Sequence, residues 1–220
     1  MAIIAAFVMP HPPLLLPEIG KGQEAAIRKT SEACEACGKL IAELKPDLII
    51  LSSPHAKMYA DEFHVSEPRE QLDHGAFVPL YFINKHYEDY KFLRISPSML
   101  SHEEHYEFGK ALAEKIGQER TVLIASGDLS HKLKADGPYG FAQEGVEFDE
   151  IVTKALDTGD FQSLLNIDPV LEDKAAECGL RPILIMAGAL DGVEFTPKLL
   201  SYENTFGVGY AVAQFIINQE

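Results

Sequence analysis

Three histidines in this 220-residue chain each follow a short apolar run, and together they could build a metal or acid–base site. They are His11 after residues 2–8, His55 after residues 47–52 and His131 after residues 121–125. Imidazole nitrogens bind divalent metals and exchange protons near neutral pH. Because ligands of open α/β sheets bind beyond the carboxyl ends of the strands, the three side chains are expected to converge on one point.

Prolines stiffen the turns that carry two of these histidines. Positions 10, 12 and 13 flank His11, and Pro54 precedes His55. Proline fixes φ and removes backbone freedom, which suits ligands that must be held in place before a metal arrives. One histidine in a loop is usually a surface residue, but three at equivalent positions favour a functional site.

The elements that must position these residues follow from hydrophobic periodicity. Continuous apolar runs predict strands at 2–8, 47–52, 77–83, 92–95 and 121–125. Helical spacing predicts helices at 23–44, 101–116, 145–157 and 176–191, the second opening on a capping box at Ser101. The pattern of residues 193–217 predicts two strands, or a strand and a short helix, with a turn at Asn204.

This alternation predicts one three-layer α/β/α domain over residues 1–220, with a mostly parallel, mixed central sheet. The segment from Ser53 to Ala76 reads as a long polar loop, and such loops often carry function. Within it, His74 precedes the strand expected at 77–83. It would reach the same sheet edge if that strand ran antiparallel to the others.

The composition excludes several classes of partner. Lys and Arg total 19 against 34 Asp and Glu, a formal net charge of −15 that disfavours nucleic acid and anionic membrane surfaces. No apolar stretch is long enough to cross a membrane. The start of the chain lacks the basic residues of a signal peptide, and three cysteines argue against a disulfide framework. A reducing, cytoplasmic location is therefore expected.

Four short motifs occur in an order that resembles a known family. They are His11-Pro12, Pro54-His55, Asp73-His74-Gly75 leading to Pro79-Leu80, and Ser126-Gly127-Asp128-Leu129-Ser130-His131. Each is weak alone, but the ordered set covers nearly the whole chain. The set resembles the LigB-like superfamily of class III extradiol ring-cleavage dioxygenases and its relatives, the Memo proteins.

The resemblance implies a set of roles. His11 and His55 would ligate Fe(II), with Zn or another divalent metal as alternatives, while His74 and His131 would bind substrate and transfer protons. The third ligand would come from near the C-terminus, as Glu in the LigB type and Cys in the Memo branch. Glu177 would complete a two-histidine, one-carboxylate triad. Cys178, followed by Gly179, is closer to the Memo pattern, and on the resemblance it is preferred.

Three functions follow as expectations. The first is an Fe(II)-dependent extradiol dioxygenase that cleaves a small catecholic or related aromatic substrate with O2. The second is a Memo-like metal-binding module of a radical-SAM-associated system, without ring cleavage. The third is a zinc hydrolase that uses the same histidines. A homo-oligomer or a partner protein of the radical-SAM-associated system is compatible with the first two.

The remaining motifs are interpreted as structural. Cys34 and Cys37 fall on the apolar face of the helix expected at 23–44, where buried cysteines are more common than a redox or zinc pair. The glycine pair Gly207-x-Gly209 is too weak to predict nucleotide binding. Four further histidines are expected at the surface, namely His64, His86, His102 and His105.

Overall fold

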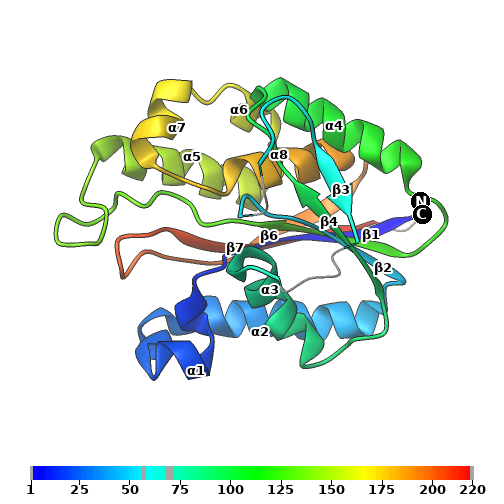
Figure 1. The fold of residues 1–220 in the computed structure, drawn as a ribbon, viewed down its shortest axis with the longest axis horizontal. Helices are drawn as coiled ribbons and strands as arrows, with labels where there is room; N and C mark the ends of the chain where they lie inside the picture. Colours follow the sequence, from blue (N-terminus) through cyan, green and yellow to red (C-terminus); the bar gives the residue numbers. More distant parts are fainter. Residues whose placement is uncertain (1, 56–57, 68–71, 219–220) are drawn as a thin grey trace.

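The computed structural model describes residues 2–55, 58–67 and 72–218, and within these ranges a seven-stranded sheet is covered by helices on both faces (Figure 1). The strands are β1 (Ile3–Met9), β2 (Leu48–Ser52), β3 (His64–Ser66), β4 (Lys91–Ser96), β5 (Thr121–Ser126), β6 (Phe195–Glu203) and β7 (Tyr210–Ile217). The α-helices are α1 (Pro17–Gly20), α2 (Arg28–Leu44), α3 (His74–Asn84), α4 (His102–Lys115), α5 (Gln143–Thr158), α6 (Gln162–Leu165), α7 (Pro169–Ala175) and α8 (Leu180–Ala189). Two 3₁₀ helices, η1 (Pro13–Leu15) and η2 (Gln23–Ile27), precede α2.

The sheet has the strand order β3-β4-β2-β5-β1-β7-β6. Its four central strands, β4, β2, β5 and β1, run parallel, whereas β3 and the β7–β6 pair are antiparallel to their neighbours. The carboxyl ends of β1, β5 and β2 therefore lie side by side at one edge of the sheet. This is the mixed, mostly parallel arrangement that the sequence predicts.

Helices cover each face of the sheet and bury a separate hydrophobic cluster against it. In Figure 1, α1, α2 and α3 lie on one side of the sheet and α4 to α8 on the other. Along β1, Phe7 and Met9 pack in the cluster with α2 and α3, while Ala6 and Val8 pack in the cluster with α5 and α8. Successive residues of a strand point to opposite faces, so burial of both faces requires the continuous apolar run seen in the sequence.

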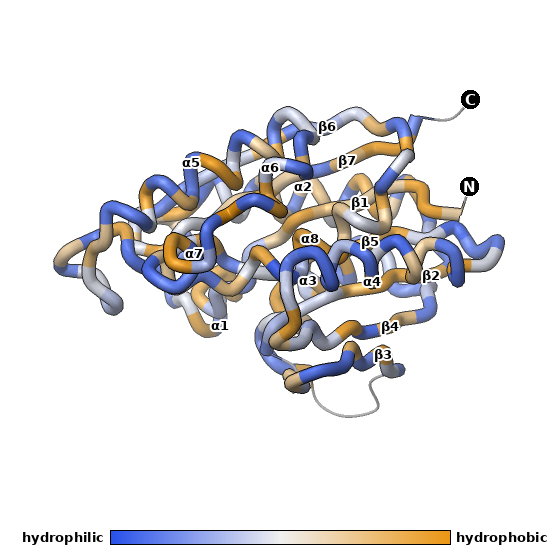
Figure 2. Tube along the Cα trace, turned by 90° about the horizontal axis from the view of Figure 1, so that it is seen from above, coloured by the Kyte–Doolittle hydropathy of each residue, from blue (hydrophilic) through white to orange (hydrophobic). Residues whose placement is uncertain are grey.

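The hydropathy of the elements matches these positions. Figure 2 shows β7 as mostly hydrophobic, whereas α5 alternates between hydrophilic and hydrophobic residues. The helix α5 has one buried face, which includes Phe148, Val152 and Leu156. The predicted helix at 101–116 is confirmed together with its capping box, in which Ser101 and Glu104 satisfy each other's backbone N–H groups. At the C-terminal end, the two-strand alternative is confirmed by β6 and β7.

The strand predicted at 77–83 is wrong, because these residues belong to helix α3. The run is apolar at almost every position, and α3 is buried on most sides, so the sequence has no polar stripe to reveal a helical period. The deciding signal is local. Asp73 caps the helix by accepting a hydrogen bond from the backbone N–H of Gly75. His74 is consequently the first residue of a helix and does not precede a strand.

The helix predicted at 176–191 begins later than expected, at Leu180. Ala176 has a φ of 53°, the left-handed conformation, and it ends α7. Glu177 and Cys178 therefore lie in the connection between two helices and not in the first turn of α8. The segment Ser53–Ala76, expected to be a loop, contains the short edge strand β3 and the start of α3, and its residues 56–57 and 68–71 lie outside the described part.

Among the residues that the structure describes, every helix is too short or too polar to cross a lipid bilayer.

Candidate metal centre

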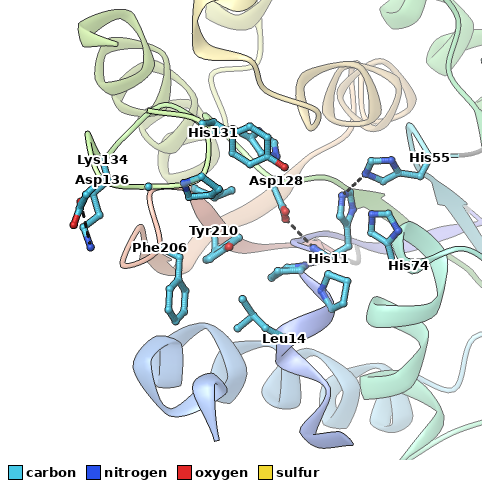
Figure 3. Close-up of a pocket in the computed structure, with 16 residues that line it drawn as sticks. His11, Leu14, His55, His74, Asp128, His131, Lys134, Asp136, Phe206 and Tyr210 are labelled. Carbon is cyan, nitrogen blue, oxygen red and sulfur yellow. Dashed lines mark hydrogen bonds and ion pairs between the residues drawn. The ribbon is translucent and has the colours of Figure 1, made fainter. Parts of the chain in front are cut away.

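His11 and His55 meet at the carboxyl edge of the parallel strands (Figure 3). His11 lies two residues beyond β1 and His55 three residues beyond β2, with β5 paired between these strands. Their Nε2 atoms are 2.9 Å apart. Of the three strand-end histidines expected to converge, His11 and His55 are in contact, and both rings present the same nitrogen to one point.

His74 completes a group of three imidazoles. One nitrogen from each of His11, His55 and His74 lies within 4.8 Å of the other two, which is the group of potential metal donors found among the described residues. The His74 ring reaches this point from the first turn of α3. Asp73 holds that turn, because its Oδ1 caps Gly75 and its Oδ2 pairs with Nη2 of the buried Arg94. Two nitrogens bonded to one ion at about 2.1 Å are at most about 4.2 Å apart, so a group spaced within 4.8 Å needs only small side-chain rotations to share one ion.

Hydrogen bonds beneath His11 determine which nitrogen faces the other rings. The Ser126 hydroxyl lies 2.9 Å from His11 Nδ1 and donates its own hydrogen to the carbonyl of Gly75. Ser126 Oγ must therefore accept from Nδ1–H, so a neutral His11 keeps its Nε2 lone pair for a ligand. Such a partner behind a histidine is typical of metal sites, where it fixes both tautomer and ring orientation.

Desolvation favours the neutral form of two of the imidazoles. Burial is the largest cause that lowers the pKa of His11 to about 3, followed by the nearby His74 and His131. His55 is exposed at the surface, yet partial desolvation is still the largest cause that lowers its pKa to about 4, with His11 and His74 adding to the effect. Both rings are thus unprotonated at neutral pH, as a metal ligand must be. The donor set, its spacing and its protonation all fit a divalent metal ion.

The two residues proposed from sequence as the third ligand are placed differently. Cys178 Sγ lies 3.6 Å from His11 Nε2 and accepts a hydrogen bond from the backbone N–H of Asp128. The Glu177 carboxylate is buried elsewhere, where it accepts from the backbone N–H of Leu180 at 2.6 Å and lies 4.0 Å from Arg181. The structure brings Cys178 beside His11, and the group of close donors formed by the three histidines does not include Glu177.

Burial also disfavours the ionised forms of these two residues. It raises the pKa of the Cys178 thiol well above its ordinary value, and the carboxylates of Asp128 and Glu177 add to this. It raises the pKa of Glu177 to about 7. Burial therefore works against the anionic form that either residue would need as a metal ligand.

A cavity of about 480 Å³ opens next to the three histidines. His131 lines this cavity. Its Nδ1 is buried and has no hydrogen-bond partner among the described residues, so a molecule in the cavity would reach the ring from its Nε2 edge. The ring of Tyr139 contacts His131 edge-on, with centroids 5.1 Å apart. The apolar and aromatic part of the wall is formed by Pro12, Pro13, Leu14, Pro138, Tyr139, Phe206, Val208 and Tyr210.

Sequence reasoning missed several residues that shape this site. Ser126 and Asp128 belong to the motif quoted above, but their roles depend on contacts with His11 that motifs do not show. Tyr210 follows the glycine pair of residues 207–209, which carries no signal for a cavity wall. Arg94 lies in β4, and only the fold brings it to Asp73.

The surface prediction fails for two of the four histidines. His105 is fully buried, with Nδ1 bonded to the carbonyl of Ser101 and Nε2 accepting from the backbone N–H of Ser98. The ring of Phe63 contacts it edge-on, and a histidine with both nitrogens satisfied can occupy a core. His102 is mostly buried and hydrogen-bonded to Glu172 at 2.8 Å, whereas His64 and His86 are exposed as predicted. Cys34 and Cys37 are buried free thiols, as predicted.

Comparisons with known proteins show what the chain is similar to. The sequence model described as the catalytic LigB subunit of aromatic ring-opening dioxygenase matches residues 56–213, well over half of the chain. The chain is 34% identical over 267 aligned positions to Protein CA_C1420 of Clostridium acetobutylicum, covering 96% of this chain and 57% of that protein. The chain thus spans little more than half the length of this curated relative.

The fold is also found in a solved structure. The crystal structure of the uncharacterized protein JW3007 from Escherichia coli K12 superposes with a TM-score of 0.63, covering 96% of this chain and 99% of that one at 16% identity. At that identity the likeness concerns the fold alone. On the match to residues 56–213, the chain belongs to the LigB family, that of the catalytic subunits of aromatic ring-opening dioxygenases.

Proposed function

We propose that the protein is a non-haem Fe(II) enzyme of the class III extradiol type, which opens the ring of a small catecholic or related aromatic substrate with O2. The observation that carries this proposal is the group of His11, His55 and His74 at the floor of a cavity lined by His131, in a chain of the LigB family. A cavity of this size beside the metal donors can accommodate a substrate with one aromatic ring.

We assign iron over the zinc hydrolase alternative on the chemistry of the family. The matching family model describes an aromatic ring-opening dioxygenase, and Zn(II) has no redox chemistry with which to activate O2.

In this proposal the residues of the chain divide the work. His11, His55 and His74 hold the metal, and Ser126 orients His11 from behind. When bound, Fe(II) would lower the pKa of a chelated catechol hydroxyl and provide the site at which O2 reacts. His131, on the cavity wall, takes the remaining proton from the substrate. The apolar residues of the wall exclude water from the ring.

The test is anaerobic reconstitution with Fe(II), followed by elemental analysis and measurement of oxygen uptake with a panel of catechols. We expect one iron per chain and oxygen uptake with at least one catechol, together with the absorbance of a ring-opened product. One metal per chain without oxygen uptake from any catechol would contradict the proposal.

Proton release on metal binding should identify the third ligand, which we expect to be His74. The low pKa values of His11 and His55 mean that both rings are already neutral between about pH 6 and 8. Binding through histidines should therefore release almost no protons from these two residues over this range.

A Cys178 ligand would behave differently, because its raised pKa keeps the thiol protonated in the same range. Binding through the thiolate would release about one proton per ion and strengthen about tenfold for each pH unit. Calorimetric titration with Zn(II) in buffers of different ionisation enthalpy measures the proton count. A release of one proton at about pH 8, above the range in which imidazoles ordinarily titrate, would assign the third position to Cys178.

Substitution provides an independent prediction about the same position. His74→Ala should weaken Zn(II) binding by more than about 100-fold, since even indirect partners of a ligand are worth about 10- to 100-fold. Cys178→Ser should change the affinity by less than about threefold. Glu177→Gln is the matched control, because glutamine still accepts from the backbone N–H of Leu180. Sharp loss of metal in Cys178→Ser with retention in His74→Ala would reverse the assignment.

A second candidate function is a Memo-like metal-binding module without ring cleavage. The observation that favours it is the position of Cys178, with its Sγ 3.6 Å from His11 Nε2. We propose that such a module would act with a partner protein of a radical-SAM-associated system or as a homo-oligomer. A thiolate-ligated metal without oxygen uptake would support this function over the first. The three free thiols support our proposal of a reducing, cytoplasmic location for either function.

A further inference from the structure

The cavity wall contains a buried tyrosine whose hydroxyl group has no assigned use. Tyr210 is the first residue of β7 and is 3% exposed. Its hydroxyl makes no hydrogen bond within the described part of the chain, yet the oxygen is not among the atoms closed off from solvent. The residue lines the cavity beside the three histidines. In the view of Figure 3, Tyr210 lies between Phe206 and His11.

Other buried tyrosines of this protein have partners for the same group. The Tyr106 hydroxyl accepts a hydrogen bond from Gln162 at 3.0 Å, and the Tyr202 hydroxyl donates to Asp149 at 2.6 Å. A buried tyrosine normally finds such a partner, because an unpaired hydroxyl in an apolar environment is costly. The Tyr210 hydroxyl therefore requires water or a ligand in the cavity as its partner.

The backbone holds Tyr210 at a fixed place in the site. The preceding residue, Gly209, donates to the carbonyl of Ser130 and accepts from the N–H of Leu129, both at 2.8 Å. These bonds tie the start of β7 to the loop that carries His131. A Cβ at position 209 would lie 2.0 Å from the carboxylate of Asp149, so only glycine allows this close approach. Such fixed placement suits a residue that orients a ligand.

The surroundings of Tyr210 make it a donor. Burial raises its pKa well above the ordinary value, and the nearby Asp128 and Tyr139 add to the effect, so the phenol keeps its proton. Phe206 and Val208 lie on the same wall and offer only apolar surface. A protonated hydroxyl beside apolar groups binds most strongly to an anionic oxygen, because hydrogen bonds to charged acceptors are about twice as strong as neutral ones.

We propose that the Tyr210 hydroxyl is a substrate-binding group that donates a hydrogen bond to an anionic oxygen of the aromatic substrate in this cavity. The inference rests on the proposed function, since the metal centre is what would hold the substrate oxygen in its deprotonated form. It deepens that function by naming the residue that distinguishes a phenolate-type ligand from an apolar ring of the same size.

Two tyrosine-to-phenylalanine variants test the proposal. Tyr210→Phe should weaken anaerobic binding of nitrocatechol to the Zn-loaded protein by about 10- to 100-fold, the loss expected for one hydrogen bond to a charged acceptor. Metal content and melting temperature should stay unchanged, because no hydrogen bond within the protein is lost. Tyr106→Phe is the control. It removes the bond to Gln162, so it should lower the melting temperature by a few degrees and leave nitrocatechol binding unchanged.

The outcomes separate this proposal from the function on which it rests. Nitrocatechol binding that is equal in wild type and Tyr210→Phe would overturn the role of Tyr210, whatever the activity. Weakened binding in Tyr210→Phe would support that role even if wild type showed no oxygen uptake, a result that would reject only the ring-cleaving function. Failure of wild type to bind nitrocatechol would overturn both. Where wild type turns over, a lowered kcat/KM with unchanged metal content is the additional expected result.

Discussion

Replacing His11 by alanine should abolish metal binding, with a loss of affinity of more than about 100-fold. The expectation follows from the position of His11 in the group, where its Nε2 lies 2.9 Å from that of His55 and its donor nitrogen is within 4.8 Å of the others. His55→Ala should have a similar effect. Calorimetric titration with Zn(II) measures this loss of metal affinity and does not require an active enzyme.

Ser126→Ala provides a graded comparison. The Ser126 hydroxyl bonds to Nδ1 of His11, the nitrogen on the side of the ring away from the other histidines, so it supports the ligand without being one. Its removal should lower the metal affinity by about 10-fold to 100-fold, less than loss of the His11 ring. His86→Ala is the control, since His86 is an exposed histidine paired with Glu35 at 2.7 Å. Metal binding in His11→Ala that equals wild type would show that the three-histidine group does not hold a metal.

Replacing His131 by alanine should leave metal binding intact and lower kcat by about 10²- to 10⁴-fold, the usual contribution of a general acid–base group. His131 lines the cavity but does not belong to the group of close donor nitrogens. Its loss should therefore remove proton transfer without removing a ligand. Oxygen uptake at saturating catechol, together with metal analysis of the same sample, measures both effects.

The result would have a different meaning if the metal were also lost. Equal loss of metal in His11→Ala, His55→Ala and His131→Ala would make His131 a ligand and leave the proton-transfer role without a residue. Unchanged kcat in a metal-loaded His131→Ala protein would remove it from the chemistry. His86→Ala again serves as the control, with unchanged kcat expected.

Much of the candidate metal centre was predictable from sequence, because its first two histidines are tied to features that are local in the chain. His11 and His55 each follow an apolar strand and a proline turn, and parallel strands with both faces buried end at a common edge. His131 follows β5 in the same way. The general fold, the capping box at Ser101 and the long helices were predictable for the same reason.

Other predictions were wrong where the same local pattern is compatible with two structures. The run at 77–83 is buried as a helix, and burial on most sides removes the polar stripe by which a helix is recognised. The start of α8 depends on the left-handed Ala176, a conformation that alanine's own preferences do not favour. The burial of His105 depends on contacts with Phe63 and Ser98, which lie outside its own helix.

By itself, the sequence determined which elements form and which histidines stand at strand ends. Only the tertiary structure decided which side chains meet. The order β2-β5-β1 places Ser126 beneath His11, and the capped start of α3 places His74 close to the same point. The turn after α7 places Cys178 near His11, while Glu177 binds the start of α8. These contacts join residues that are far apart in the chain. They form only when the whole sheet and its helices pack together, so a pattern of neighbouring residues does not reveal them.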